Sequence, residues 1–369
     1  MKSYCKHLRL DRAHVQAAFT EWSEAEAGRK NLHRVTLEHG SPDALIDEIV
    51  SQIEGRSLQV PPIRRYNHLE PTNGKLREIG VQSVKQQVLD YVAVLALKPL
   101  LDARLGYYQV ASVKGKGQKF AAQKIRSWSQ KGGYWTHLDV RQCYPTVRHH
   151  VVDQLLSKRV RNPDVLYVCR FLLSTYREGL EIGSYFSLRM AQLVLSEAYH
   201  HVESLHKTRR GKTVALVAHQ IWYMDDAVLL SADKRDLRSA TRSLERYMRQ
   251  TLGLTLKPWK ISQVGDDEPI DLAGFVVRPG RTTLRSGIFL RARRAFQSFD
   301  KHPTPKGAAR VCSYWGWLKH SDSKNFIHRT QAERIFNHAR RMVAAEQRRK
   351  NNAHTIQHPD KPRNGRGAP

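Results

Sequence analysis

Residues 215–230 read Ala-Leu-Val-Ala-His-Gln-Ile-Trp-Tyr-Met-Asp-Asp-Ala-Val-Leu-Leu, and they place two adjacent carboxylates between two apolar runs. Both runs are rich in β-branched and aromatic residues, so the short polar break predicts a tight β-hairpin with Asp225 and Asp226 at its tip. Adjacent carboxylates repel each other unless a cation offsets them. The stretch therefore predicts a site for positive charge at the tip of the hairpin.

A pair of hard divalent cations is the expected partner of these carboxylates. Carboxylates suit Mg²⁺, and two ions about 3.5–4 Å apart hold both the attacking and the leaving oxygen of a phosphoryl transfer. Such a site needs a further acid, and Asp139 is the candidate because it ends a β-like run within residues 133–147. A second acidic pair, Asp266-Asp267, has no apolar runs beside it and is expected to be an exposed turn.

These stretches resemble the motifs of reverse transcriptases. Tyr223-Met224-Asp225-Asp226 is similar to the signature of that family, and Asp139, followed five residues later by an aromatic residue, is similar to its first catalytic motif. The resemblance implies an RNA-directed DNA polymerase in which the three aspartates are catalytic. It also implies that they bind two Mg²⁺ ions as cofactors, with Mn²⁺ as the alternative metal.

The composition is strongly basic, with 62 Lys plus Arg against 34 Asp plus Glu and a net charge of +28. Such an excess implies a polyanionic partner bound through its phosphates, and an anionic membrane is the rival explanation. No apolar run reaches about 18 residues and no signal-like segment opens the chain, so we expect no membrane partner. The four scattered cysteines argue against zinc modules and disulfides and indicate a reducing, cytoplasmic setting.

The resemblance assigns a group of residues to nucleotide binding. A turn at 71–74 with alternating residues beyond it predicts a β-hairpin similar to the family's fingers, where Lys75 and especially Arg77 would contact the triphosphate. An ordinary basic surface strand is the alternative. Tyr144 would stack under the sugar and exclude a ribose 2′-hydroxyl, so that the substrate is a deoxynucleotide. The further members of this group are Val140, Gly183, and Lys257 or Lys260 near the departing pyrophosphate, between which the sequence does not choose.

A second group is assigned to the primer and template on the same resemblance. Its members lie in the aspartate hairpin, in a Gly-x-x-x-Ser pattern, in a Gly-containing strand pair and in a basic Gly-rich segment: Tyr223, Met224, Ser187, Gly274, Phe275, Lys114 and Lys116. Lys119 continues the basic segment. The chain departs from the family at Leu188, where retron, diversity-generating retroelement and group II intron enzymes usually have Gln. This departure favours the divergent bacterial enzymes linked to phage defence.

The expected fold is α+β, a right-hand polymerase with fingers, palm and thumb. We expect a helical N-terminal segment at 1–58, fingers at 59–132, a palm with inserted helices at 133–284, a helical basic thumb at 285–345 and a disordered basic tail at 346–369. Within the palm, the patterns predict an amphipathic helix over 233–252 and a strand over 254–261.

The expected function is synthesis of DNA on an RNA template, with dNTPs as substrates and a dedicated structured RNA as partner. Antiphage defence is the preferred setting, and a diversity-generating retroelement is the second. Two other classes stay open, namely a template-independent or protein-primed polymerase and an inactive RNA-binding scaffold. A second copy of the chain or an accessory protein is a further potential partner, although the sequence shows no interface.

Overall fold

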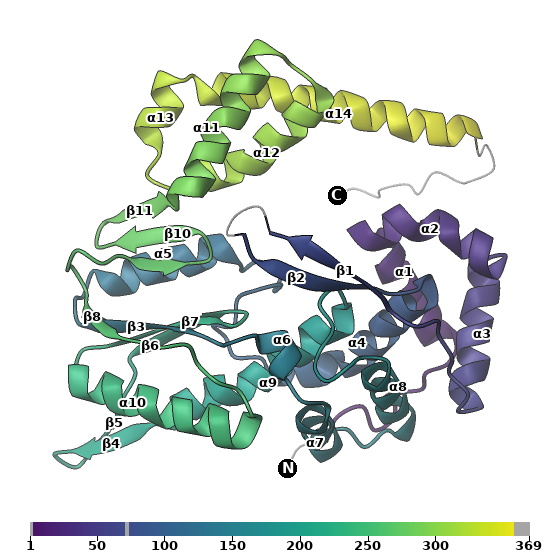
Figure 1. The fold of residues 1–369 in the computed structure, drawn as a ribbon, viewed down its shortest axis with the longest axis horizontal. Helices are drawn as coiled ribbons and strands as arrows, with labels where there is room; N and C mark the ends of the chain where they lie inside the picture. Colours follow the sequence, from purple (N-terminus) through teal and green to yellow (C-terminus); the bar gives the residue numbers. More distant parts are fainter. Residues whose placement is uncertain (1–2, 71–73, 358–369) are drawn as a thin grey trace, which may run out of the picture. The chain divides into compact units, whose positions relative to one another are not determined.

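The computed structural model describes residues 3–70 and 74–357, and Figure 1 shows their arrangement. The chain divides into two compact units. The first comprises residues 1–117 and 132–266, and the second comprises residues 118–131 and 267–369. Within the described ranges, no helix is both long enough and apolar enough to cross a membrane.

The first unit is built on a four-stranded antiparallel sheet in the order β6-β7-β3-β8. The strands are β6 (His219–Tyr223), β7 (Asp226–Ser231), β3 (Tyr134–Asp139) and β8 (Ile261–Gln263). Strands β6 and β7 form the predicted hairpin, and Asp139 ends β3 as expected. Because successive side chains alternate between faces, Asp139 and Asp226 point to one face of the sheet while Leu138 and Ala227 point to the other.

Helix α10 (Lys234–Tyr247) covers the apolar face of this sheet and continues as a short π-helix (Met248–Leu252), and α9 (Tyr185–Ser204) packs beside α10. Leu138, Ala227 and Leu229 of the sheet share one buried cluster with Leu237 and Leu244 of α10. The predicted amphipathic helix over 233–252 is thereby confirmed. Its packing leaves the sheet face that bears the carboxylates free of α10.

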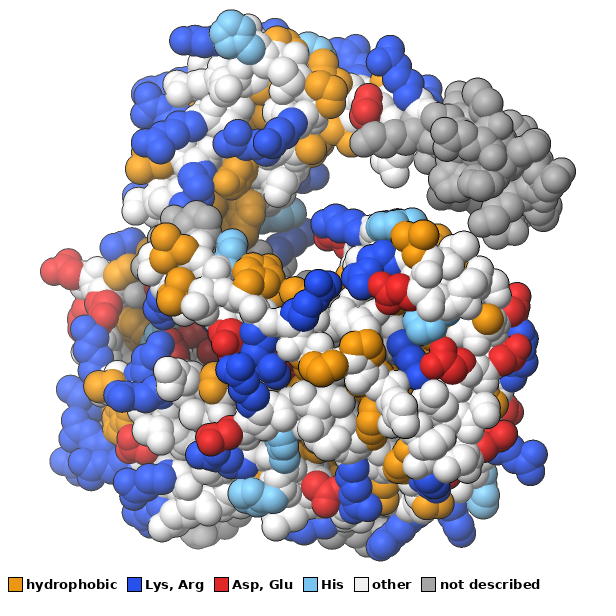
Figure 2. All heavy atoms as spheres, turned by 45° about the vertical axis from the view of Figure 1, so that its right-hand side comes forward, with side chains coloured by type: hydrophobic (Ala, Val, Ile, Leu, Met, Phe, Trp, Pro, Cys, Tyr) orange, Lys and Arg blue, Asp and Glu red, His pale blue; other side chains and the backbone are white. Residues whose placement is uncertain are grey.

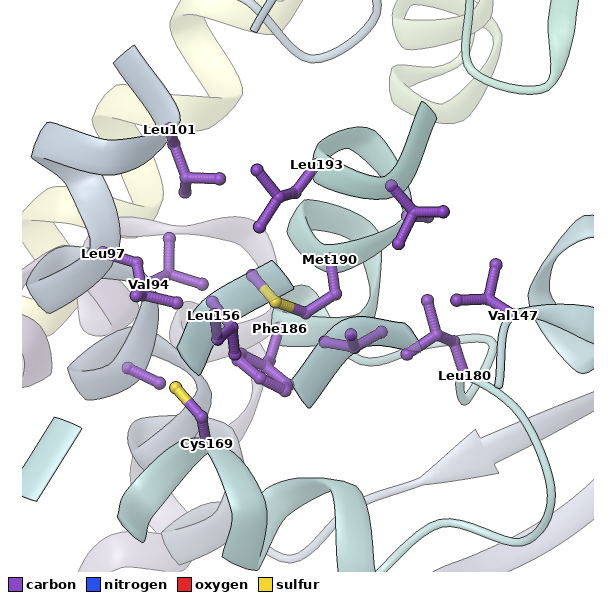
Figure 3. Packing of buried hydrophobic residues seen from close by; sticks show 14 of the residues in the cluster. Val94, Leu97, Leu101, Val147, Leu156, Cys169, Leu180, Phe186, Met190 and Leu193 are labelled. Atoms are coloured by element: carbon purple, nitrogen blue, oxygen red, sulfur yellow. The ribbon is translucent and has the colours of Figure 1, made fainter. Parts of the chain in front are cut away.

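The rest of the core lies between α9 and three further helices: α4 (Val84–Arg104), α7 (His149–Arg159) and α8 (Pro163–Ser174). Figure 3 shows Leu97 and Leu101 of α4 beside Met190 and Leu193 of α9, with Cys169 of α8 below them. Helices α7 and α8 are separate, and α8 begins at Pro163. The Asn162 side chain accepts hydrogen bonds from the amides that open α8, and proline fits the first turn.

Three helices form the N-terminal segment: α1 (Arg12–Glu24), α2 (Glu26–His39) and α3 (Pro42–Glu54). Asp11 and Ser41 cap α1 and α3 with their side chains. A further hairpin consists of β1 (Arg64–Leu69) and β2 (Leu76–Val81), which are the strands of the expected fingers hairpin. Residues 71–73 of its predicted turn lie outside the described residues.

One hairpin was not predicted from the sequence. Strands β4 (His206–Arg209) and β5 (Lys212–Ala215) pair around Arg210-Gly211, both of which have positive φ. Positive φ at both central residues is the geometry of a type I′ turn, and Arg-Gly was the available signal.

The predicted strand over 254–261 is wrong for most of its length. Only Leu256 forms a bridge, to Val140, and the strand proper begins at Ile261. Pro258 lacks the N–H that a ladder requires, which explains the irregular stretch before β8.

The second unit combines a three-stranded sheet with helices. Its sheet runs β11-β10-β9, with β9 (Ile270–Leu272), β10 (Phe275–Arg278) and β11 (Arg281–Leu284), and α5 (Gln118–Ser129) contacts it. Four helices follow, namely α11 (Ser286–Lys301), α12 (Pro305–Lys319), α13 (Lys324–Arg329) and α14 (Ala332–Gln357). Helix α14 continues past 346, so the first part of the predicted disordered tail is helical, and residues 358–369 lie outside the described ranges.

Candidate active site

The strand register brings the three predicted catalytic carboxylates together. Asp139 at the end of β3 is directly opposite Asp226 at the start of β7, and Asp226 is in turn opposite Tyr223. Met224 and Asp225 form the two-residue turn, in which Met224 has a φ of 56°. The carbonyl of Asp225 accepts a hydrogen bond of 3.3 Å from the amide of Val140, which ties the turn to the end of β3.

The carboxyl of Asp225 lies in a negative environment. Its pKa is raised above the ordinary value, first because the group is buried and next because the charge of Asp226 is close, with Asp139 adding to the effect. Arg77 of the β1–β2 hairpin acts in the opposite direction and lowers this pKa. The negative charge of the aspartate cluster therefore exceeds the positive charge around it. Arg77 is close enough to offset part of that charge.

Lys257 is the cation nearest to the first aspartate. Its Nζ lies 2.5 Å from Oδ2 of Asp139, and its amide donates to the carbonyl of the same residue at 2.8 Å. The Leu256–Val140 bridge places it there. The backbone of Lys260, by contrast, accepts a hydrogen bond from the Thr136 hydroxyl at 2.8 Å. The structure thus places Lys257 at the carboxylates, a choice that the sequence left open.

His137 was not anticipated from the sequence. It lies two residues before Asp139 on the same face of β3, and its Nε2 is 3.3 Å from Oδ1 of Asp226. This nitrogen is buried, and the contact is too bent to count as a hydrogen bond. His137 is therefore a neighbour of Asp226 with no other described partner for that nitrogen.

The predicted triphosphate contacts lie on β2 and just before it. The Arg77 side chain is about half exposed and pairs with Glu70 at 3.1 Å. Lys75 is exposed, and its carbonyl accepts the amide of Glu70 at 2.8 Å.

Tyr144 lies in the short helix α6 (Cys143–Thr146) that follows β3. Burial raises the pKa of the Tyr144 hydroxyl well above its ordinary value, and the charge of Asp225 adds to the shift. Burial likewise raises the pKa of the Cys143 thiol, with Asp225 and Asp139 contributing. A thiol held protonated is a packing group rather than a nucleophile.

The loop before α9 is pressed against the β1–β2 hairpin. Gly183 has a φ of 110°, and a Cβ there would lie 2.6 Å from the carbonyl oxygen of Gly80. The amide of Gly80 donates to Ile182 at 2.9 Å. Ser187 is fully buried, and its hydroxyl accepts from the amide of Glu181 at 3.0 Å, so this side chain shapes the loop and has no exposed surface for a template.

Two buried acids hold this loop, and neither was singled out from the sequence. Glu181 pairs with Arg65 of β1 at 2.6 Å. Asp90 of α4 accepts hydrogen bonds from the Ser184 hydroxyl at 2.7 Å and from the amide of Phe186 at 3.2 Å. Desolvation raises the pKa of Asp90 to about 6, although these hydrogen bonds act in the opposite direction. For Asp90, the only signal in the sequence was that a single acid interrupts the apolar stripe of α4.

The basic Gly-rich segment begins beside β6. The carbonyl of Tyr108 and the amide of Val110 bond the backbone of Trp222 at 2.8 and 2.9 Å. Lys116 is engaged within the segment, since its Nζ donates to the carbonyl of Tyr107 and lies 3.8 Å from the centre of that ring. Lys114 is exposed.

Gly274 and Phe275 belong to the second unit. Gly274 has a φ of 88° in the turn between β9 and β10, and a Cβ there would lie 2.8 Å from Trp317. Phe275 is buried, with its ring centre 5.1 Å from that of Trp317. Both residues are thus accounted for by packing within this unit. Lys119, in α5, also lies in the second unit.

The donor chemistry of the aspartate cluster fits divalent cations. In the described part of the chain, no three His, Cys, Asp or Glu side chains already converge as a finished metal site. The three aspartates nevertheless offer hard oxygen ligands from adjoining strand ends, with mutual repulsion that a cation would relieve. The exposed pair Asp266-Asp267 lies in a turn, as predicted, and offers no such setting.

Two solved structures are similar to this chain at low sequence identity. One is telomerase from Candida albicans in complex with a TWJ fragment of telomeric RNA, with a TM-score of 0.48, 12% identity, and coverage of 80% of this chain and 63% of that chain. The other is the BmCPV RNA-dependent RNA polymerase at its elongation state, with a TM-score of 0.50, 11% identity, and coverage of 93% and 30%. The chain thus spans less than two thirds of either protein, and the second likeness indicates a polymerase-like α+β fold.

No curated protein matches this chain in sequence. The family described as reverse transcriptase (RNA-dependent DNA polymerase) does match, over residues 67–277. That match includes β2 with Arg77, the β3 strand with Asp139 and the hairpin with Asp225 and Asp226, and it extends over more than half of the chain. The chain belongs to the reverse transcriptase family and contains an RNA-directed DNA polymerase domain.

Proposed function

We propose that Asp139, Asp225 and Asp226 are the catalytic carboxylates of this polymerase and that they bind two Mg²⁺ ions. The observation that carries the proposal is the register, in which Asp139 faces Asp226 across two strands while Asp225 occupies the adjoining turn. Bound ions of this kind activate a 3′-hydroxyl and stabilise the triphosphate during in-line phosphoryl transfer.

The residues around the carboxylates have roles that follow from their positions. Arg77 acts electrostatically on Asp225 and offers a guanidinium to the triphosphate. Lys257, held at Asp139, can serve the departing pyrophosphate as an acid or as an electrostatic stabiliser. Tyr144, near Asp225, would exclude a ribose 2′-hydroxyl. We retain the assignment of fingers, palm and thumb to 59–132, 133–284 and 285–345 as part of the proposal.

The proposal is tested by primer extension on primed poly(rA) with dTTP and Mg²⁺. Asp225→Asn and Asp139→Asn should each lower the rate by at least about 1000-fold, because the ligands act as a unit. Asp266→Asn, in the exposed acidic turn, is the matched control and should retain full activity. Equal activity in Asp225→Asn and the control would overturn the assignment.

A finer proposal concerns the template. We propose a dedicated structured RNA, supported by the net charge of +28, and antiphage defence as the setting, supported by Leu188 in place of the usual Gln. Sequencing the DNA that the purified protein makes on its copurifying RNA tests the first point. Product complementary to that RNA supports a dedicated template, whereas product without complementarity would indicate untemplated synthesis.

A further inference from the structure

Helix α10 and the short π-helix after it carry a row of arginines that the polymerase site does not use. We name it the arginine stripe, and all of its members are exposed: Arg235, Arg238, Arg242, Arg246 and Arg249. Their spacing of three or four residues places them on one face of the helix. At 1.5 Å per residue the stripe is about 21 Å long.

The arginine stripe does not stabilise the helix that carries it. Neighbouring members are three or four residues apart, so like charges face each other along the whole row, an arrangement that destabilises a helix. None of the five forms an ion pair within the described part of the chain. A face that served only solubility would gain from alternating Glu and Lys, so the repulsion points to an anionic partner.

The β4–β5 hairpin adds to the same charge. Its tip bears Arg209, Arg210 and Lys212, all exposed, and Lys207 of β4 forms an ion pair with Asp236 of α10. That pair ties the hairpin to the arginine stripe. Figure 2 shows Lys and Arg side chains gathered at the lower left, on the side where Figure 1 places α10, β4 and β5.

This surface lies on the opposite side of the sheet from the carboxylates. The apolar side chains of α10 pack with Leu138, Ala227 and Leu229, which point away from the face that bears Asp139 and Asp226. The arginine stripe projects from the other side of the helix, outward from the sheet. A template–primer duplex at the carboxylates would therefore lie on the other side of the sheet from the arginine stripe.

We propose that the arginine stripe and the β4–β5 tip bind the phosphate backbone of double-stranded RNA outside the polymerase site. The inference deepens the proposed function, because it places the structured part of the partner RNA on a defined surface. A long row of guanidiniums suits a regular phosphate array. The surface shows no exposed Phe, Tyr or Trp on which unpaired bases could stack, so a duplex fits it better than a single strand.

Other anionic partners fit the surface less well. An amphipathic helix that binds a membrane inserts its apolar face into the lipid, whereas the apolar face of α10 is buried in the core. A protein partner would need apolar or aromatic anchors at the centre of its interface, and among the large apolar side chains of the surface only Val214 is exposed.

The experiment measures binding of a 20-base-pair RNA hairpin of arbitrary sequence in EDTA across a salt series. The test variant is Arg238→Gln/Arg242→Gln/Arg246→Gln. The matched control, Lys6→Gln/Arg9→Gln/Arg161→Gln, removes three exposed charges that likewise form no ion pair in the described structure. We expect the test variant to bind at least tenfold more weakly, with a salt slope shallower by about 3, and the control to change less than threefold.

A second variant, Arg209→Gln/Arg210→Gln/Lys212→Gln, keeps the test decisive if the first does not fold by circular dichroism. Wild-type affinity in the folded variants, or an equal loss in the control, would overturn the proposal. So would tighter binding of the wild type to phosphatidylserine vesicles than to the hairpin. Extension of primed poly(rA) is measured separately, so failure of the polymerase proposal and failure of this one are distinguishable.

Discussion

His137 and Asp226 lie side by side on neighbouring strands, 3.3 Å apart between Nε2 and Oδ1. A side chain that lies against a metal-binding carboxylate restricts its orientation, and changes in such groups typically cost about 10–100-fold in metal affinity or activity. Under the proposed function, His137 is thus a positioning residue for Asp226. It touches neither nucleotide nor primer in this assignment.

His137→Ala should therefore raise the Mg²⁺ concentration needed for half-maximal dTTP incorporation by about 10–100-fold. His137→Gln keeps a polar side chain of similar reach beside Asp226 and should restore most of the loss. His150→Ala, at an exposed histidine of α7, serves as the control. A lower maximal rate at unchanged Mg²⁺ dependence would show that His137 does not act through the metal site.

At this scale the sequence could predict the aspartates but not their neighbours. Asp139, Asp225 and Asp226 interrupt β-prone runs, so their pattern is visible locally. Lys257 and Lys260 flank the same irregular stretch, and only the bridge between Leu256 and Val140 decides which one reaches Asp139. The alternation of side chains along β3 places His137 on the same face as Asp139. Its neighbour Asp226, however, is set by strand pairing across about 90 residues of chain.

Among the elements, the β1–β2 hairpin and the loop before α9 are joined by a buried ion pair. The Arg65 and Glu181 side chains are only 14% and 7% exposed, and they are 2.6 Å apart. Removing one partner of such a pair leaves an uncompensated buried charge, at a cost of about 3–5 kcal/mol, whereas replacing both is much milder. Since β2 also carries Arg77, the loop and the proposed triphosphate contact are mechanically linked.

Glu181→Met should accordingly lower the free energy of unfolding by about 3–5 kcal/mol in urea titrations and raise the KM for dTTP. Arg65→Met/Glu181→Met should recover much of the stability. Glu178→Gln breaks an exposed pair with Arg148 instead and should cost less than about 1 kcal/mol. The linkage is refuted if the double variant is as unstable as Glu181→Met.

The type of an element could be predicted where its local sequence pattern was strong. The prediction failed where two local rules conflicted. The helix over 233–252 has an apolar periodicity and a cap at Asp233, and the aspartate hairpin has two β-prone runs that pair in the sheet. The strand predicted over 254–261 has β-prone residues around a proline. Because proline cannot donate a ladder hydrogen bond, the strand begins only at Ile261. The β4–β5 hairpin is so rich in Lys and Arg that it lacks the apolar alternation by which strands are recognised.

For the whole molecule, the division into two units could not be predicted from the sequence. Helix α5 precedes β3 in the chain but contacts β9, β10 and β11, more than 100 residues later. Such long-range contacts leave no local mark in the sequence. The net charge, by contrast, is a global property read directly from composition, and it indicated a nucleic-acid partner before any element was placed.

The first unit should respond to pH through Asp90. Its folded-state pKa is raised from 3.8 to about 6, so the folded protein binds the proton more tightly than the unfolded chain. The stabilising contribution is therefore fully present below about pH 4 and is lost as the pH rises through about 6. Two pKa units correspond to at most about 3 kcal/mol.

Asp90→Asn removes this titration, so the free energy of unfolding of the variant relative to wild type should rise by up to about 3 kcal/mol between pH 4 and pH 7. Because two compact units can unfold separately, the measurement follows α4 and α9 amides by pulsed hydrogen exchange along a urea series. Asp266→Asn, in an exposed turn, should track wild type throughout. A constant offset between Asp90→Asn and wild type across this range would mean that Asp90 is ionised in the folded protein, and that the loop before α9 is held by a charge.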